Sequence, residues 1–106
     1  MTTEKTDEGS AGLRRSIEIA YSHRELFNVF PRIFAPMPVR IEGTRLTAED
    51  GGKKIAVELE PERTRRLGAV FTLQDTNIHF TFHGYTEIEA DAFLRHFLLR
   101  TQRGGG

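Results

Sequence analysis

Four histidines, His23, His79, His83 and His96, are the residues to test first for metal binding or general-base chemistry. His79 and His83 share one face of a predicted strand, but four residues at about 3.4 Å each separate them by roughly 13 to 14 Å, too far to bind one ion. The helical H-E-x-x-H pair of a metalloprotease is absent. We therefore expect no metal or cofactor, and we expect His79, Thr81 and His83 to line a polar sheet face that binds a ligand or a partner.

The serines and paired carboxylates do not form a recognisable catalytic pattern. Ser10 lies in a polar N-terminal segment, Ser16 on the polar side of a predicted strand and Ser22 at a predicted helix cap. A G-x-S-x-G nucleophile elbow is absent. Glu58 and Glu60 share a strand face that is interpreted as solvated. The sequence therefore favours a domain that is not an enzyme, with an enzyme that uses an unrecognised site as an alternative.

Phosphate recognition would require a glycine-rich loop or well-placed arginines. The glycine pair at 51–52 lies between two predicted strands, so it is interpreted as a turn. Arginine supplies 12 of the 15 basic residues, and guanidinium groups bind phosphate and carboxylate through two parallel hydrogen bonds. Arg63, Arg65 and Arg66 are therefore candidates for the ligand or partner surface.

Nucleic acid is not the expected partner, because the last helix begins with acidic residues and no exposed strand face carries interleaved aromatics.

The last nine residues, Leu98 to Gly106, resemble the end of a ubiquitin-like modifier or sulfur carrier. In that family a flexible basic stem and a terminal Gly-Gly enter an activating enzyme. The resemblance implies a carrier or modifier that acts through its C-terminal glycine. A third glycine, and a predicted helix where that family has a strand, are departures from the family pattern.

The elements that must position these residues follow from the periodicity of apolar side chains. Alternation from Leu13 to Tyr21 predicts a half-buried strand. Ser22 and Glu25 have the spacing of a capping box, so a helix is expected to begin there. Pro31 predicts a short helix, a kink and a second turn over 32–35. The apolar stripe of this segment recurs at spacings of three and four and consists of Leu26, Phe27, Phe30, Ile33 and Phe34.

Four strands and a second helix follow. The strands are predicted over 39–48, 54–60, 67–73 and 77–83. Gly43 is expected to form a bulge, because the parity of the apolar residues changes there, and the charged segment 61–66 is interpreted as a turn. Thr86 and Glu89 repeat the capping-box spacing at the start of the last helix. Its predicted buried stripe is Ala90, Phe93, Leu94, Phe97 and Leu98.

Length and composition indicate one small domain. The chain has 106 residues, with 15 Lys and Arg against 15 Asp and Glu, and it has no cysteine. A cytoplasmic, reducing location is expected. Residues 1–12 are predicted to be a disordered tail, 13–101 a single domain and 102–106 a flexible Gly-rich end. Neither a signal peptide nor an apolar run of about 20 residues is present, so secretion and membrane insertion are not expected.

The element order predicts an α+β fold. We expect a β-α-β4-α order, in which a kinked N-terminal helix and a C-terminal helix cover one face of an antiparallel sheet. This order is similar to compact helix-grip and TATA-binding-protein-like folds, and a ferredoxin-like arrangement is the alternative. The expected function is a small non-enzymatic interaction or small-ligand-binding domain. Because 67–73 has no charged residue, Phe71 marks a partner surface and a homodimer is expected if this segment lies at a sheet edge.

Overall fold

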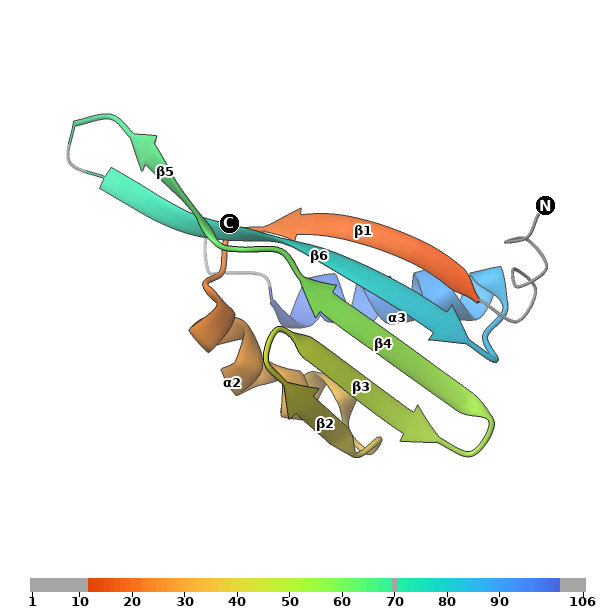
Figure 1. The fold of residues 1–106 in the computed structure, drawn as a ribbon. Coiled ribbons are helices and arrows are strands. Elements are labelled where there is room, and N and C mark those ends of the chain that lie inside the picture. The colour runs from red at the N-terminus through yellow and green to blue at the C-terminus, as the bar shows by residue number, and fades with distance from the viewer. Residues whose placement is uncertain (1–11, 70, 102–106) are drawn as a thin grey trace, which may run out of the picture.

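The structure is a computed structural model that describes residues 12–69 and 71–101. These residues form, in order (Figure 1), β1 (Leu13–Ile19), α2 (His23–Phe34), β2 (Val39–Glu42), β3 (Arg45–Asp50), β4 (Lys53–Leu59), β5 (Arg63–Leu67), β6 (Phe71–His83) and α3 (Glu87–Arg100). In this described part, five strands rather than the predicted four lie between the helices. Apart from Gly12, the predicted tail over 1–12 and the predicted end over 102–106 lie outside the described residues.

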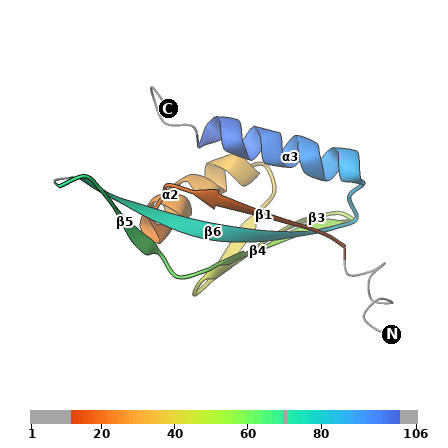
Figure 2. The ribbon, with the colours of Figure 1, turned by 90° about the horizontal axis from the view of Figure 1, so that it is seen from above.

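The strands form an antiparallel sheet, which confirms the predicted α+β class. Its order is β1-β6-β4-β3-β2, so β1 and β2 are the edge strands. The long strand β6 pairs with β1 and β4 through its second half. Its first half pairs with β5, from Arg63↔Asp75 to Leu67↔Phe71. We call this second pair, β5 with Phe71–Asp75, the β5–β6 arm, and it extends past the rest of the sheet (Figures 1 and 2).

Both helices lie on one side of the sheet (Figure 2), and the hydrophobic core fills the space between the two layers. From β6, the alternating residues Ile78, Phe80 and Phe82 are buried in this core. Side chains of opposite parity point to the other side, because successive residues of a strand face opposite ways. We call that other side the open face. The alternation seen in the sequence therefore separates a buried layer from a polar surface.

The helices begin where the capping boxes predict. Ser22 Oγ accepts the backbone N–H of Glu25 at 3.1 Å, and Glu25 Oε1 accepts that of Ser22 at 2.9 Å. The predicted division into a short helix and a second turn after Pro31 is wrong, because α2 continues through Pro31 to Phe34. A helix-interior proline costs about 3 kcal/mol, but Phe30 and Phe34 on either side are buried against the sheet and α3. Full burial of a Phe side chain is worth about 1.5 to 3 kcal/mol, so the burial of these two rings is comparable with that cost.

The predicted strand over 39–48 is two strands joined by a tight turn. Gly43 has φ +62° and turns the chain instead of forming a bulge. The register places Ile41 opposite Leu46 and therefore on the same face of the sheet. The change of parity in the sequence was real, but its cause is a reversal of the chain.

The predicted weak strand over 67–73 is also wrong. The chain reverses after Leu67, with Gly68 at φ +77°, and β6 then runs unbroken from Phe71. The charged segment interpreted as a turn forms β5. Strand β6 continues through Asp75 and Thr76, and both of these buried polar side chains have partners on neighbouring segments. The Asp75 carboxylate pairs with arginines of β5, and Thr76 Oγ1 donates to the carbonyl of Tyr21 at 2.9 Å.

Helix α3 packs through fewer residues than predicted. Phe97 is fully buried, with its ring centroid 6.2 Å from Phe30 and 5.4 Å from Phe80. Leu98 was expected in the same stripe but is 46% exposed. It lies beside Ile19 of the edge strand β1, where no further strand of the described chain covers it. Neither α2 nor α3 is long and apolar enough to cross a membrane.

Candidate functional site

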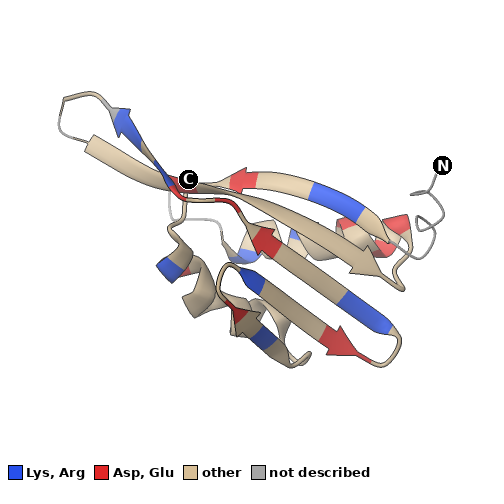
Figure 3. Ribbon diagram, viewed as in Figure 1, with Lys and Arg blue, Asp and Glu red and all other residues tan. Residues whose placement is uncertain are grey.

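Charged residues occur along β1, β2, β3, β4 and β5 (Figure 3), and those of opposite parity to the buried residues lie on the open face. The register aligns them in rows that cross the strands. One row is Ser16, His79, Glu58, Arg45 and Glu42. The next is Arg14, Thr81, Ala56, Thr47 and Arg40. Thr81, Ala56 and Thr47 have short side chains. The surface is therefore lower along the middle of this second row than along the first row.

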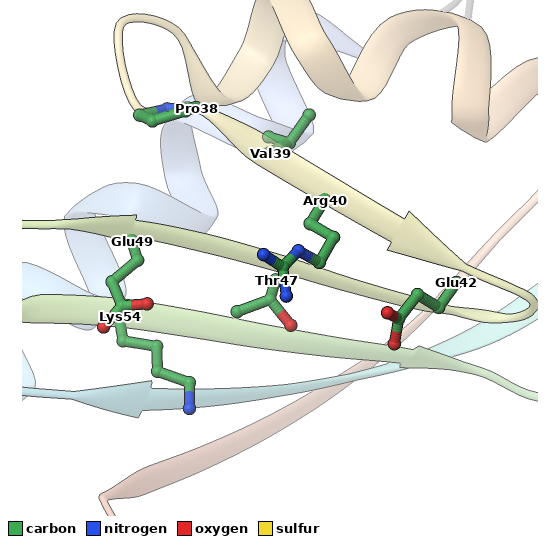
Figure 4. Close-up of a pocket in the computed structure, with 7 residues that line it drawn as sticks. All are labelled: Pro38, Val39, Arg40, Glu42, Thr47, Glu49 and Lys54. Carbon is green, nitrogen blue, oxygen red and sulfur yellow. The ribbon is translucent and has the colours of Figure 1, made fainter.

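A hollow of about 600 Å³ opens over β2, β3 and β4. We call it the β2–β4 hollow. It is lined by Pro38, Val39, Arg40, Glu42, Thr47, Glu49 and Lys54 (Figure 4). Two of these side chains are cationic and two are anionic. Within the described chain, none of the four forms an ion pair or a side-chain hydrogen bond.

A smaller hollow of about 200 Å³ lies over β4 and β6. We call it the β4–β6 hollow. Its lining contains Arg45, Ala56, Val57, Glu58, His79, Thr81 and His83. The three residues that the sequence proposed on β6 therefore line one surface. The charges here are internally paired, because Arg45 Nε donates to Glu58 Oε1 at 2.9 Å. This bond, followed by that from Thr44, holds the pKa of Glu58 below its ordinary value.

His79 links three strands through a chain of hydrogen bonds. Its Nδ1 lies 2.7 Å from Ser16 Oγ of β1, and its Nε2 lies 2.6 Å from Glu60 Oε2 at the end of β4. Asn77 donates to the other Glu60 oxygen at 3.2 Å. The bond from His79, then that from Asn77, lowers the pKa of Glu60. An ionised Glu60 accepts a hydrogen bond from His79 Nε2, and Ser16 Oγ can then donate to Nδ1 of a neutral imidazole or accept from Nδ1 of an imidazolium.

Ser16 and Glu60 were considered separately from the sequence, and the chain that joins them through His79 was not predicted. No local signal places them together, because 63 residues separate Ser16 from His79 and 19 separate His79 from Glu60. A serine bonded to a histidine that is bonded to a carboxylate has the order of a nucleophile, a base and an orienting acid. Ser16 does not line either hollow on this face. The chain of bonds therefore holds β1 and the end of β4 to β6, and His79 is the member of the chain that also lines the β4–β6 hollow.

The arginines of the β5–β6 arm are largely engaged with carboxylates. Glu18 Oε2 accepts from Arg63 Nη2 at 2.5 Å and from Arg65 Nη2 at 3.0 Å. Arg65 also donates to Asp75, and this bond is the main cause of its raised pKa. Asp75 is only 3% exposed, and its Oδ1 lies 3.6 Å from Arg63 Nε without a hydrogen bond. These two arginines neutralise a buried acid, so they are not free to bind an anion.

The remaining proposed residues lie apart from these clusters. Arg66 pairs in register with Thr72, on the opposite face of the arm from Arg65. Phe71 is 58% exposed near the turn of the arm. The seven residues proposed from the sequence therefore divide among the β4–β6 hollow, the ion cluster around Asp75 and the end of the arm. The structure does not bring them together as one patch.

Two further proposals from the sequence concern metal binding and the C-terminal glycines. Within residues 12–69 and 71–101, no group of three or more His, Asp or Glu side chains could hold a metal ion. Gly104 to Gly106, proposed as a modifier's active end, lie outside the described residues. Comparison with known proteins finds no matching family model, and no curated protein or solved structure that matches the chain.

Proposed function

We propose that this chain is a non-enzymatic interaction domain that binds a short, extended peptide segment bearing both acidic and basic side chains. The binding site is the β2–β4 hollow. One observation carries the proposal: Arg40, Glu42, Glu49 and Lys54 face one hollow, and none of them forms an ion pair within the described chain, although the register sets Glu49 opposite Lys54. A cytoplasmic location belongs to the same proposal, because a chain without cysteine has no need of an oxidising compartment.

The rest of the open face supports this choice by contrast. Arg45 is paired with Glu58, and His79 with Glu60. A paired charge has its partner already, whereas an unpaired one in a hollow can form a new bond with a ligand. Arg40 can hold a ligand carboxylate through two hydrogen bonds, and the carboxylates can accept from a ligand ammonium. The mixture of signs disfavours a polyanion such as nucleic acid, because the carboxylates would repel phosphates.

The dimensions of the hollow suit a peptide. A volume of about 600 Å³ lies in the range of ligand-binding clefts. The hollow crosses two strand spacings of about 4.8 Å, roughly the length of three residues of extended chain. Because the four charged groups are in contact with solvent, their attraction to a ligand is screened by salt. We therefore expect binding that weakens steeply as ionic strength rises.

The test compares three fluorescently labelled octapeptides of equal length: alternating Glu and Lys, all Glu, and all Lys. Fluorescence anisotropy at low ionic strength should show the tightest binding for the alternating peptide. Each single-sign peptide should bind at least tenfold more weakly, because it meets like charges in the hollow. Equal binding of all three peptides, or no binding of the alternating one, would refute the proposal.

Charge reversal then locates the site. The double variant R40E/K54E makes all four charged side chains of the hollow acidic, so its preference should switch to the all-Lys peptide. The matched control is R24E/R32E, which reverses two exposed arginines of α2 on the other side of the sheet. The control should keep the order of affinities seen with the unmodified chain. A switch in both double variants would mean that net charge, rather than the hollow, determines the preference.

An enzyme that uses Ser16 is the second candidate, and the Ser16–His79–Glu60 chain is the observation in its favour. Ser16 Oγ would attack the carbonyl carbon of an ester while its proton passes to His79 Nδ1. The alcohol would leave with that proton, and the acyl group would remain on Ser16 until water hydrolyses it. Incubation with an aryl acetate should then give an acetyl adduct on Ser16 that is absent from S16A. An unmodified Ser16 removes this candidate.

A further inference from the structure

Strand β1 is an edge of the sheet with a long unpaired side. It pairs with β6 through all seven residues from Leu13 to Ile19, and no strand of the described chain pairs with its other side. An open edge of this length is a template for another strand unless it is blocked. We propose that two copies of this chain form a symmetric dimer in which their β1 strands pair antiparallel about Ser16.

The charges of β1 are complementary to themselves in this register. A two-fold axis through Ser16 places Arg14 opposite Glu18 of the partner subunit, and the same contact occurs again on the other side of the axis. Directly opposed residues of antiparallel strands lie about 4.5 to 5.5 Å apart, close enough for an ion pair. Arg14 has no ion pair in the described chain. Glu18 binds Arg63 and Arg65 through Oε2 alone, which leaves its Oε1 for Arg14 of the partner subunit.

Neighbouring registers are less favourable. In a symmetric antiparallel pair, one residue lies opposite its own copy at the two-fold axis. A change of register therefore moves the axis from one residue of β1 to the next. One such step places Arg15 opposite its own copy, and a further step places Arg14 opposite its own copy. Like charges directly opposed destabilise a sheet. Moving the axis the other way, to Ile17, leaves both Arg14 and Glu18 without an opposite charge. Moving it one residue further places Glu18 opposite its own copy. Only pairing about Ser16 matches both charges and uses the whole strand.

The helix side of β1 provides a second, independent argument. An apolar hollow of about 370 Å³ beside Ile19 is lined by Ile19, Arg95, Leu98, Leu99 and Thr101. Its leucines, Leu98 and Leu99, are 46% and 64% exposed. The proposed register places Leu13 of the partner subunit directly opposite Ile19, on this side of the sheet. The dimer therefore covers the hollow with an apolar side chain, and it explains why Leu98 continues the apolar stripe of α3 although it is exposed in one copy.

This interface differs from the one expected around Phe71. The segment Phe71–Asp75 is also paired on one side only, with β5, but it lies beyond the end of β1 and is therefore not part of the β1 interface. Phe71 therefore provides a control: F71K should dimerise as the unmodified chain does. A second control is R40E, which makes the same charge change as R14E but on the opposite edge strand β2. Arg14 and Arg40 are both exposed and have no ion pair in the described chain, so neither reversal should disturb the fold.

Sedimentation velocity over a range of micromolar concentrations tests the proposal. The unmodified chain, F71K and R40E should all sediment as a species of twice 12.1 kDa. R14E should raise the dimer dissociation constant by at least tenfold, because two attractive contacts become repulsive. L98D should do the same by placing a charge in the covered hollow. Circular dichroism confirms that each variant is folded. A monomeric unmodified chain, or an R14E variant that dimerises unchanged, would overturn the proposal, as would loss of the dimer in F71K alone.

Discussion

Arg65 and Arg66 are adjacent in the sequence but have different roles. Arg65 donates to the buried Asp75, whereas Arg66 lies on the other face of the arm and has no ion pair in the described chain. Residue type alone could not distinguish them, which is why both were assigned to one basic surface. Successive residues of a strand face opposite ways, so Arg65 and Arg66 of β5 lie on different faces. Because this segment was interpreted as a turn, the difference was not predicted.

The first prediction compares these two arginines. Arg65→Met leaves the buried Asp75 carboxylate with only Arg63, whose Nε lies 3.6 Å from Oδ1. We expect a measurable loss in the free energy of unfolding, because the buried carboxylate loses its hydrogen-bonded partner. Arg66→Met should change it by less than about 0.5 kcal/mol. Urea unfolding of both variants at neutral pH measures the difference, and equal effects would show that the ion cluster does not stabilise the arm.

Within the elements, local sequence signals were sufficient for the two helix caps and for the buried stripe of α2. Both capping boxes and the buried stripe of α2 involve residues three or four apart, and all were predicted. The two missed hairpin turns, at Gly43 and Gly68, follow strands whose partners are also nearby, but a glycine fits a bulge as well as a turn. The contacts of His79 with Ser16 and Glu60 depend on strand order and register. Nothing within one strand specifies these, so this part of the candidate site could not be predicted.

The packing of α3 gives the second prediction. Phe97 is fully buried against Phe30 and Phe80, whereas its neighbour Leu98 is 46% exposed. Phe97→Ala should therefore cost about 3 to 5 kcal/mol in the free energy of unfolding. Leu98→Ala, measured by urea unfolding at a concentration where the chain is monomeric, should cost less than about 1 kcal/mol. A larger loss for Leu98→Ala than for Phe97→Ala would show that α3 packs on the sheet through the face of Leu98, which would contradict the packing described above.

The third prediction concerns pH and the start of α3. The backbone N–H of Thr86, followed by Lys53, lowers the pKa of Glu89 from its ordinary value of 4.5. A carboxylate with a lowered pKa in the folded state stabilises that state at any pH above 4.5, and this contribution is lost as the pH falls through the folded pKa. Unfolding free energies of the unmodified chain and E89Q should therefore differ at neutral pH and converge in acid. A difference that is constant with pH would contradict this role of the charge.

At the scale of the whole molecule, one face of the sheet is used for folding and the other remains available for binding. The two helices cover the face of the sheet that carries the apolar residues. The polar residues that alternate with them along the strands therefore lie together on the open face. Most charges on that surface are already paired in the described chain. Of those without an ion pair, Arg14 lies on β1, and the other four gather over β2, β3 and β4. Pairing of two β1 strands would join two such surfaces, with the hollows at the outer ends. A peptide with two mixed-charge segments would then bind the dimer more tightly than the monomer.

The most direct test of peptide binding at the β2–β4 hollow is a map of backbone amide chemical shifts during titration with the alternating Glu and Lys octapeptide. The largest changes should fall on β2, β3 and β4 around Arg40, Thr47 and Lys54, and they should disappear in R40E/K54E. The amides of α2 and α3 should be unaffected. Changes that are spread evenly over the molecule, or centred on the β5–β6 arm or the helices, would contradict the account.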